Sequence, residues 1–256
     1  MASNQSAELT VVILTLNEAD NIQGCIESVN WADRVVVLDS FSQDETAALA
    51  QAAGAEVQQS LFQNYAQQRN VVLDSLETDW VFFVDADERG RAALAGEIHG
   101  CLARQPETGW YVPRYNYIFG KLTRGGGWYP DYQLRLFRHG CVRYERPVHE
   151  IAVVDGDVGY LHNALIHYNY RNVAHFRAKQ GAYTSYDASI LKERGIRPRP
   201  HNFLLQPLRQ FWWRFVTLAG YKDGRHGLRL SLYMTYYEWV KYRKLERMWR
   251  EAKGME

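Results

Sequence analysis

The stretch Trp80-Val81-Phe82-Phe83-Val84-Asp85-Ala86-Asp87-Glu88 decides the fold of this chain more than any other. Its five leading apolar residues predict a buried strand that delivers the following carboxylates to the edge of a sheet. Asp85 and Asp87 leave this strand close together, and their mutual repulsion is relieved when a cation lies between them. The pattern indicates a site for Mg²⁺ or Mn²⁺ beside a substrate diphosphate, with a solvated acidic turn as the alternative.

Strand and helix patterns alternate on the N-terminal side of this stretch. We expect strands at 9–15, 35–39 and 56–58 and helices at 17–29, 42–53 and 65–76. The second helix is expected to open with the capping box Ser42-Gln43-Asp44-Glu45 and to end at Gly54. This β-α-β-α-β-α-β order predicts an α/β fold, a mostly parallel sheet covered by helices.

Polar residues follow three of these strands: Thr15-Leu16-Asn17-Glu18, then Asp39, then Asp85 with Asp87. Ligands bind beyond the carboxyl ends of the strands in sheets of this kind. Because three polar clusters converge on one edge, we expect the ligand site there.

The rest of the chain is less regular. A helix is expected at 91–102 and strands at 109–115 and 133–138, and a glycine-rich loop lies between the two strands. After Tyr168 the pattern is helical again, and Arg197-Pro198-Arg199-Pro200 indicates a hinge. We therefore expect a catalytic domain over residues 1–195, with halves at 8–104 and 105–172, followed by a helical extension over 196–256.

Charge is distributed unevenly along the chain. Residues 1–194 contain 17 Lys and Arg against 24 Asp and Glu, net −7, whereas residues 195–256 contain 13 against 5, net +8. This asymmetry predicts a basic C-terminal segment that faces an anionic partner. The three cysteines lack C-x-x-C spacing, which argues against a disulfide framework or zinc site and fits a reducing cytoplasm. We expect neither a signal peptide nor a membrane span.

The chain resembles the family 2 glycosyltransferases in four ordered motifs: Thr15-Leu16-Asn17-Glu18, Asp39 with Ser40 and Asp44, Gln68-Arg69-Asn70, and Asp85-Ala86-Asp87-Glu88. Three later motifs are similar to the branch that includes the lipopolysaccharide-core β-glucosyltransferases: Gly126-Gly127-Trp128-Tyr129-Pro130-Asp131, Arg135-Leu136-Phe137-Arg138, and Val148-His149-Glu150. The resemblance implies a GT-A fold, with a Rossmann-like sheet and a mixed acceptor half. It also implies inverting, metal-dependent transfer of a sugar from a nucleoside diphosphate, expected to be UDP, to an acceptor hydroxyl.

On the donor side, the resemblance implies a role for each residue at the ligand edge. Asp39 accepts a hydrogen bond from the N3–H of uracil, or it is a turn carboxylate. Thr15, Asn17 and Glu18 line the base and ribose, although Asn17 is equally suited to cap a helix. Arg69 meets the diphosphate through its guanidinium group, the alternative being a surface arginine.

The resemblance also implies a metal site and a general base. Asp87 is expected to bind Mn²⁺ or Mg²⁺ directly, while Asp85 touches the ribose or reaches the metal through water. His167 completes the metal shell or is structural. Inversion requires a carboxylate that takes the acceptor proton during attack; Glu150 is the first candidate and Asp131 the second.

On the acceptor side, Trp128 and Tyr129 beside three glycines indicate a mobile lid with aromatic faces for a sugar ring, or a flexible surface loop. The motifs add Arg135 and His149 as acceptor-side candidates.

Aromatic residues are interleaved with Arg and Lys from Phe203 to Arg250, a composition typical of helices at a membrane interface. Each basic residue near an anionic surface adds about 1 kcal/mol to binding. We expect peripheral association with the inner face of the cytoplasmic membrane; the alternative is that these aromatics pack on the catalytic domain or a second protomer. No nucleic-acid recognition motif is present, so no nucleic-acid partner is expected.

Two other functional classes remain beside hexose transfer to a lipid-linked glycan or lipopolysaccharide-core-like acceptor. A nucleotidyltransferase for sugar phosphates uses a similar sheet, but its glycine-rich loop after the first strand is missing from Thr15-Leu16-Asn17-Glu18. A non-catalytic membrane scaffold with a degenerate transferase domain predicts loss of carboxylates, yet Asp39, Asp85, Asp87 and Glu150 are all present.

Overall fold

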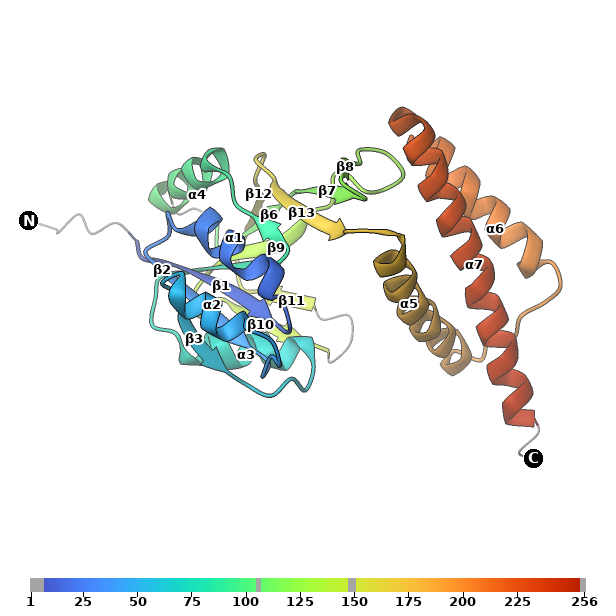
Figure 1. The fold of residues 1–256 in the computed structure, drawn as a ribbon, viewed down its shortest axis with the longest axis horizontal. Helices are drawn as coiled ribbons and strands as arrows, with labels where there is room; N and C mark the ends of the chain where they lie inside the picture. Colours follow the sequence, from blue (N-terminus) through green and yellow to red (C-terminus); the bar gives the residue numbers. More distant parts are fainter. Residues whose placement is uncertain (1–6, 105–106, 147–150, 254–256) are drawn as a thin grey trace, which may run out of the picture. The chain divides into compact units, whose positions relative to one another are not determined.

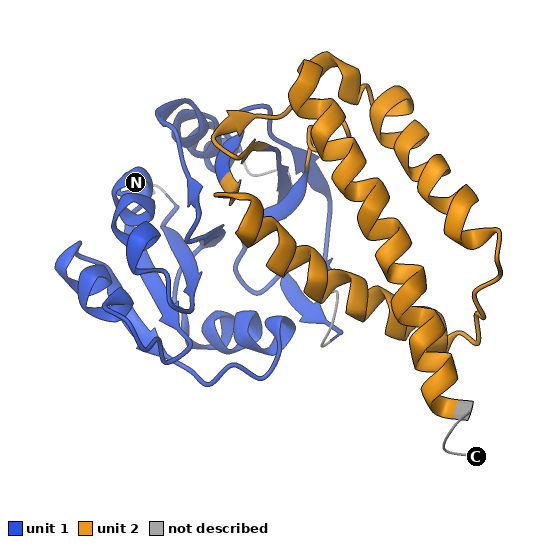
Figure 2. Cartoon of the chain, turned by 45° about the vertical axis from the view of Figure 1, so that its right-hand side comes forward, with its two compact units in different colours: residues 1–114, 132–167 blue, residues 115–131, 168–256 orange. Residues whose placement is uncertain are grey.

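A computed structural model describes residues 7–104, 107–146 and 151–253. The chain forms two compact units: residues 1–114 with 132–167, and residues 115–131 with 168–256 (Figure 2). The sequence places a boundary at residue 195, whereas the compact units divide elsewhere, and the helix before that residue belongs to the second unit. The assignment of a function to each part stays a prediction.

A seven-stranded sheet forms the centre of the first unit, with the order β12-β6-β9-β4-β1-β2-β3 (Figure 1). The strands β3, β2, β1 and β4 run parallel, whereas β9 is antiparallel to both β4 and β6. The bounds are β1 Leu9–Thr15, β2 Arg34–Asp39, β3 Glu56–Gln59, β4 Trp80–Asp85, β6 Gly109–Val112, β9 Gln133–Arg138 and β12 Val158–Tyr160. The predicted α/β class with a mostly parallel sheet is therefore confirmed.

Helices cover both faces of this sheet because β1 and β4 are apolar on both sides. Val11 and Ile13 pack with buried residues of α1 (Ala19–Val29), α2 (Thr46–Ala52) and α4 (Ala92–Arg104). Val12 and Phe83 point to the other face, where they pack with α3 (Tyr65–Ser75) and with Tyr144. Continuous apolar runs are the expected signature of strands buried in this way.

The predicted capping box is wrong, and the helix-cap alternative for Asn17 is not observed. Glu45 precedes α2 without a side-chain cap; instead, Asp44 accepts hydrogen bonds from the backbone N–H groups of Thr46 at 3.0 Å and Ala19 at 3.2 Å. Asn17 does not cap α1, which is preceded by Glu18; Asn17 adopts φ 55°, a left-handed conformation that Asn tolerates better than most residues. The predicted end of α2 is confirmed, since Gly54 has φ 87°.

Short strands complete the first unit. The strand β5 (Glu88–Arg89) pairs antiparallel with β13 (Leu165–Tyr170), and this register places His167 opposite Glu88. The strands β10 (Val142–Glu145) and β11 (Ile151–Val154) form a second antiparallel pair. The expected strand 109–115 is split at Pro113, which lacks the N–H group that a continuing ladder needs; its second half belongs to β7 (Arg114–Ile118).

The second unit contains a hairpin and a layer of helices. β7 pairs with β8 (Lys121–Leu122). The helix α7 (Gly224–Lys253) contacts both α5 (Val173–Glu193) and α6 (Asn202–Trp212), and the short segments η1 (Trp213–Thr217) and η2 (Gly220–Asp223) connect α6 to α7. None of the described helices is long and apolar enough to cross a bilayer.

Aromatic side chains hold this helical unit together. Phe176 of α5 lies between Tyr170, Tyr233 and Tyr237, with ring centroids 4.7–5.8 Å away. A second cluster joins α5 to α7 through Ala188, Tyr242 and Leu245, with Phe203 and Trp249 packed against it. Several aromatics that the sequence assigns to the membrane are therefore internal, as the packing alternative expected.

Candidate donor site at the carboxyl ends of the strands

The loops that follow β1 and β2 are tied together by Asp39. Its carboxylate is fully buried and accepts hydrogen bonds from the Thr15 and Ser42 hydroxyls at 3.2 and 2.5 Å, the Ser42 N–H at 3.0 Å and the Gln59 amide at 3.2 Å. Four donors occupy the acceptor positions that a carboxylate offers. In this state Asp39 organises the turn, which is the alternative considered for it; its nucleobase role stays a prediction.

Asn17 links the same two loops. Its side-chain oxygen accepts from the Gln43 N–H at 2.8 Å, and its own N–H donates to the Ser42 hydroxyl at 2.8 Å. Glu18 accepts from the Asn21 amide at 2.6 Å, and its N–H donates to the Thr46 hydroxyl at 2.8 Å. Thr15, Asn17, Glu18 and Asp39 are thus brought together at one edge, as predicted.

Asp85, at the end of β4, is held by arginines. Arg135 of β9 donates to both of its oxygens, at 3.0 and 2.5 Å, and Arg69 of α3 lies 3.9 Å away. Arg69 also lies over the rings of Phe83 and Tyr144, 5.8 and 5.2 Å from their centroids. Arg135 is therefore positioned to fix Asp85; its predicted acceptor contact stays untested.

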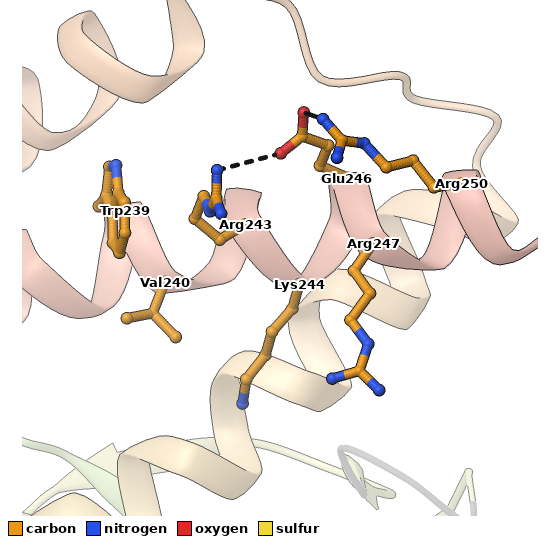
Figure 3. A pocket seen from close by; sticks show the side chains of 7 residues that line it. All are labelled: Trp239, Val240, Arg243, Lys244, Glu246, Arg247 and Arg250. Carbon is orange, nitrogen blue, oxygen red and sulfur yellow. Dashed lines mark hydrogen bonds and ion pairs between the residues drawn. The ribbon is translucent and has the colours of Figure 1, made fainter.

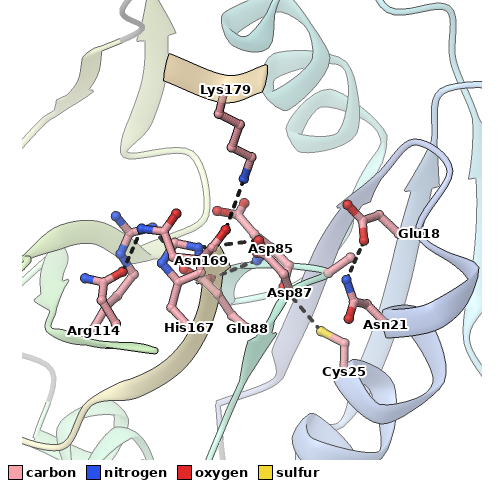
Figure 4. Close-up of polar contacts among 12 residues, drawn as sticks. Glu18, Asn21, Cys25, Asp85, Asp87, Glu88, Arg114, His167, Asn169 and Lys179 are labelled. Carbon is pink, nitrogen blue, oxygen red and sulfur yellow. Dashed lines mark hydrogen bonds and ion pairs between the residues drawn. The ribbon is translucent and has the colours of Figure 1, made fainter. Parts of the chain in front are cut away.

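Glu88 is a fully buried carboxylate that the sequence motif contains but to which we had assigned no role. Its oxygens accept from Arg114 at 3.1 Å, from Arg135 at 3.3 Å and from the Asp85 N–H at 2.9 Å (Figure 4). Burial of an unpaired carboxylate is costly, so Arg114 and Arg135 are what makes this position tolerable. No pattern around Arg114 in the sequence announces this pairing.

The charges of this cluster reinforce one another. Burial opposes ionisation of Asp85, but the positive charges of Arg135, Arg69 and Arg114 and the hydrogen bonds from Arg135 outweigh it, so the pKa of Asp85 lies far below its usual range. Burial likewise disfavours the charged form of Arg135, yet Asp85 and Glu88 raise its pKa well above the ordinary value. Asp85 is therefore a permanent anion whose oxygens are committed to arginine.

Asp87 and His167 form a separate pair beside this cluster. The Nε2 atom of His167 lies 3.5 Å from an oxygen of Asp87, and both side chains are largely buried. The other ring nitrogen of His167, Nδ1, is buried without a hydrogen-bond partner among the described residues. The antiparallel pairing of β13 with β5 places His167 here, next to the acidic motif (Figure 4).

The Asp87–His167 pair fits a divalent cation. Two ligands on adjacent coordination positions of an ion bound at about 2.1–2.3 Å lie about 3.0–3.3 Å apart, close to the observed separation. No group of three or more His, Cys, Asp or Glu side chains surrounds this point in the part of the chain that the structure describes. Two protein ligands would leave the other positions of an ion such as Mn²⁺ or Mg²⁺ for water and substrate phosphates.

The acceptor-side candidates Trp128, Tyr129 and Asp131 belong to the second unit. Trp128 packs edge-to-face on Tyr170, Tyr129 stacks on Tyr115 at 5.0 Å, and Asp131 accepts a hydrogen bond from the Asn116 amide at 3.0 Å. These contacts attach Trp128, Tyr129 and Asp131 to the rest of the second unit. Their predicted role as a mobile, sugar-stacking lid stays a prediction. Glu150 and His149 lie outside the described residues, so the general base stays a prediction.

Comparison with known proteins places the chain in a family. Residues 10–89 match the family model described as Glycosyl transferase family 2. The lipopolysaccharide core biosynthesis glycosyltransferase LpsC of Rhizobium meliloti is 33% identical over 213 residues, which cover 78% of this chain and 77% of LpsC. The chain belongs to the family 2 glycosyltransferases. An uncharacterized glycosyltransferase of Rickettsia bellii is 27% identical over 229 residues, covering 84% of this chain and 77% of that protein.

This family 2 glycosyltransferase also has a solved structural neighbour. Glucosyl-3-phosphoglycerate synthase from Mycobacterium tuberculosis, crystallised with phosphoglyceric acid, superposes with a TM-score of 0.50 at 18% identity, covering 76% of this chain and 82% of that one. At this identity the likeness concerns the fold alone, and it agrees with the GT-A architecture that the motifs implied.

Proposed function

We propose that this glycosyltransferase transfers a hexose, with inversion and with help from Mn²⁺ or Mg²⁺, from a UDP-sugar to a hydroxyl of a lipid-linked glycan or lipopolysaccharide-core-like acceptor. The observation that carries the proposal is the pairing of Asp87 with His167 beside an Asp85 already neutralised by Arg135. Because Asp85 is committed to arginine, Asp87 is the carboxylate left to meet a cation. The similarity to LpsC favours a cell-envelope acceptor.

The reaction assigns a task to each part of the donor edge. The acceptor oxygen attacks the anomeric carbon while the bond from that carbon to the diphosphate breaks on the opposite face. Asp87 and His167 would hold the cation, which would supply positive charge beside the leaving diphosphate. Arg69 presents a permanent positive charge to the same group, and the Arg135–Asp85 pair keeps the strand end rigid. Glu150, or Asp131 in its place, takes the acceptor proton.

The test is donor binding and hydrolysis across UDP-, GDP-, ADP- and dTDP-sugars with Mn²⁺, Mg²⁺ or EDTA. We expect metal-dependent binding of one UDP-sugar, and we expect Asp87→Asn to abolish transfer without unfolding the protein. Asp74→Asn is the matched control, since Asp74 is exposed on α3 and pairs with the exposed Arg143. Normal turnover of Asp87→Asn in Mn²⁺ overturns the metal assignment. A folded protein that binds no nucleotide supports the scaffold alternative instead.

We also propose that the C-terminal residues 196–256 bind an anionic membrane surface, and that α6 with η1 supplies the apolar contact. Large apolar side chains recur along one side of this segment and are 38–63% exposed: Leu204, Leu205, Leu208, Trp212, Trp213 and Val216. Residues four apart in a helix share a face, so they form one continuous stripe. Helices with such a face lie in the interface plane rather than spanning the bilayer.

Basic side chains accompany this stripe on the neighbouring helix. A depression on α7 is lined by four cations and one acid, beside Trp239 and Val240: Arg243, Lys244, Arg247, Arg250 and Glu246 (Figure 3). Glu246 binds Arg250 at 2.7 Å and Arg243 at 3.5 Å, which leaves an excess of positive charge. Anionic headgroups are attracted to such a surface.

Vesicle flotation tests the membrane proposal with the full-length protein. Leu205→Glu combined with Leu208→Glu places two charges in the stripe, and we expect at least about a tenfold loss of partitioning into phosphatidylglycerol vesicles. Leu61→Glu is the control, because Leu61 is a more exposed leucine on the first unit. Equal binding by the double variant and the control overturns the assignment of this stripe.

A further inference from the structure

The glycine-rich loop at Thr123–Trp128 is bound by the segment that connects α6 to α7. The carboxylate of Asp223, at the end of η2, accepts hydrogen bonds from the backbone N–H groups of Arg124 at 3.1 Å and Gly125 at 2.6 Å. The Gly126 N–H donates to the Leu218 carbonyl at 2.8 Å. A carboxylate that accepts consecutive backbone N–H groups makes charge-assisted hydrogen bonds, which are stronger than neutral ones.

This loop needs glycines because the segment that connects α6 to α7 passes very close to its backbone. A Cβ atom on Gly125 would lie 2.3 Å from the Ala219 carbonyl oxygen, and one on Gly127 would lie 2.8 Å from the Leu218 side chain. Gly126 and Gly127 also have φ of 66° and 80°. These glycines therefore allow the loop to pack closely against the segment that connects α6 to α7.

Arg214 of η1 makes the second attachment. One of its guanidinium nitrogens donates to the Gly126 carbonyl at 2.7 Å, and the group lies 5.4 Å from the centroid of the Trp128 ring. Burial lowers the pKa of Arg214, against the opposing influence of Tyr170 and Glu238. A planar guanidinium group suits this combination of carbonyl binding and ring stacking better than lysine does.

The buried side chain of Asn116 links the loop Thr123–Trp128 to Asp131. The Asn116 amide nitrogen donates both to the Trp128 carbonyl at 2.8 Å and to Asp131 at 3.0 Å. The Asn116 oxygen in turn accepts from Asn169 at 3.0 Å. Displacement of the loop therefore disturbs Trp128 and Asp131 together.

We propose that Asp223 and Arg214 are positioning residues for acceptor use, acting through the loop Thr123–Trp128 that they hold. The inference rests on the proposed transfer reaction, in which Trp128, Tyr129 and Asp131 serve the acceptor. It gives the C-terminal segment a part in catalysis that membrane binding does not require. It also means that deleting residues 203–256 removes loop contacts as well as the lipid-facing stripe.

The experiment compares Asp223→Asn with Asp187→Asn in the full-length protein. Asparagine keeps the size of the side chain but replaces one carboxylate oxygen, which accepts hydrogen bonds, with an NH₂ group, which donates them. Asp187→Asn is the control because Asp187 is exposed on α5. Steady-state rates are measured with UDP-glucose, or the donor that the panel identifies, and with deacylated lipopolysaccharide core oligosaccharide. We expect Asp223→Asn to lower kcat/KM for the oligosaccharide at least about tenfold, while donor affinity and donor hydrolysis by water are unchanged.

Two further measurements keep the proposal falsifiable. Hydrogen exchange is expected to be faster in peptides covering residues 123–128 of Asp223→Asn and unchanged in β1 and β4. Arg214→Lys, which keeps the charge, is expected to show the same selective loss of acceptor use. If the unmodified protein transfers sugar but Asp223→Asn matches Asp187→Asn, or loses donor and acceptor affinity equally, the positioning role is overturned. Absence of transfer by the unmodified protein overturns the proposed reaction itself.

Discussion

Replacing Arg135 by methionine tests the account of the acidic motif most directly. The Arg135 side chain contacts both Asp85, at 2.5 Å, and Glu88, at 3.3 Å, and only 7% of it is exposed. Methionine retains most of the packing volume but leaves the two carboxylates without this counter-charge. We expect the variant to fold with a lower free energy of unfolding.

The size of this loss follows from the burial of Glu88. Removing one partner of a buried ion pair costs about 3–5 kcal/mol, because the other charge is left uncompensated. Arg114 remains 3.1 Å from Glu88, and 34% of the Asp85 side chain faces water, so we expect the lower end, about 3 kcal/mol. For a chain of this size that corresponds to a fall of about 6–12 °C in Tm.

Thermal and urea unfolding, followed by circular dichroism, measure the effect. Arg143→Met is the matched control, since Arg143 binds Asp74 at 2.7 Å with both side chains more than half exposed; it should cost less than about 1 kcal/mol. Adding Glu88→Gln to Arg135→Met should restore part of the loss, because the fully buried side chain that lost one of its two arginines is then neutral. Equal stability of the Arg135 and Arg143 variants would refute the reasoning.

The difference in stability between the unmodified protein and Arg135→Met has a predictable pH dependence. The folded-state pKa of Asp85 lies below its unfolded value, so ionised Asp85 contributes stability above about pH 4, and this contribution is lost as the pH falls. Without Arg135 the folded-state pKa of Asp85 rises. The stability difference between the unmodified protein and Arg135→Met should therefore narrow below about pH 4.

Three further outcomes are expected. Glu150→Gln should remove transfer while nucleotide binding persists; retained activity in this variant together with its loss in Asp131→Asn would move the base to Asp131. His167→Gln should raise the Mn²⁺ concentration needed for half-maximal donor binding by about tenfold, whereas an unchanged requirement would make His167 structural. Burial raises the pKa of Cys25 far above its ordinary value, so iodoacetamide should label Cys101 and Cys141 at pH 8 well before Cys25, as peptide mass spectrometry would report.

The order of strands and helices from β1 to β4 followed from the sequence because the pattern is local. A strand covered on both faces must be apolar at every position, and Leu9–Thr15 and Trp80–Val84 satisfy this condition without reference to any other residue. The polar residues after β1, β2 and β4 were placed at one edge by the same argument. The two readings of Asn17 stayed open in the sequence because a helix cap and a left-handed turn favour the same residue type.

Local sequence patterns could not predict the role of the glycine-rich loop or which of the C-terminal aromatic residues are buried. Gly125 is conformationally permissive in any loop, and only the approach of Ala219 shows why it is needed there. Trp212 and Tyr237 look alike in sequence, yet the first is 63% exposed and the second is packed against Phe176. Helix periodicity identifies the apolar faces of α6 and α7. Which of these faces is covered depends on the neighbouring helices in the folded unit.

The sequence by itself therefore determined the parallel part of the sheet, the edge where its polar residues gather and the family motifs, since each depends on residue types within one short segment. The tertiary structure alone decided which charges neutralise each other and what holds the acceptor-side loop. Arg135 is 50 residues from Asp85, and Asp223 is 98 residues from Gly125. Contacts between residues so far apart in the sequence depend on how the strands and helices are connected and packed in the whole unit, not on the conformational preferences of one segment.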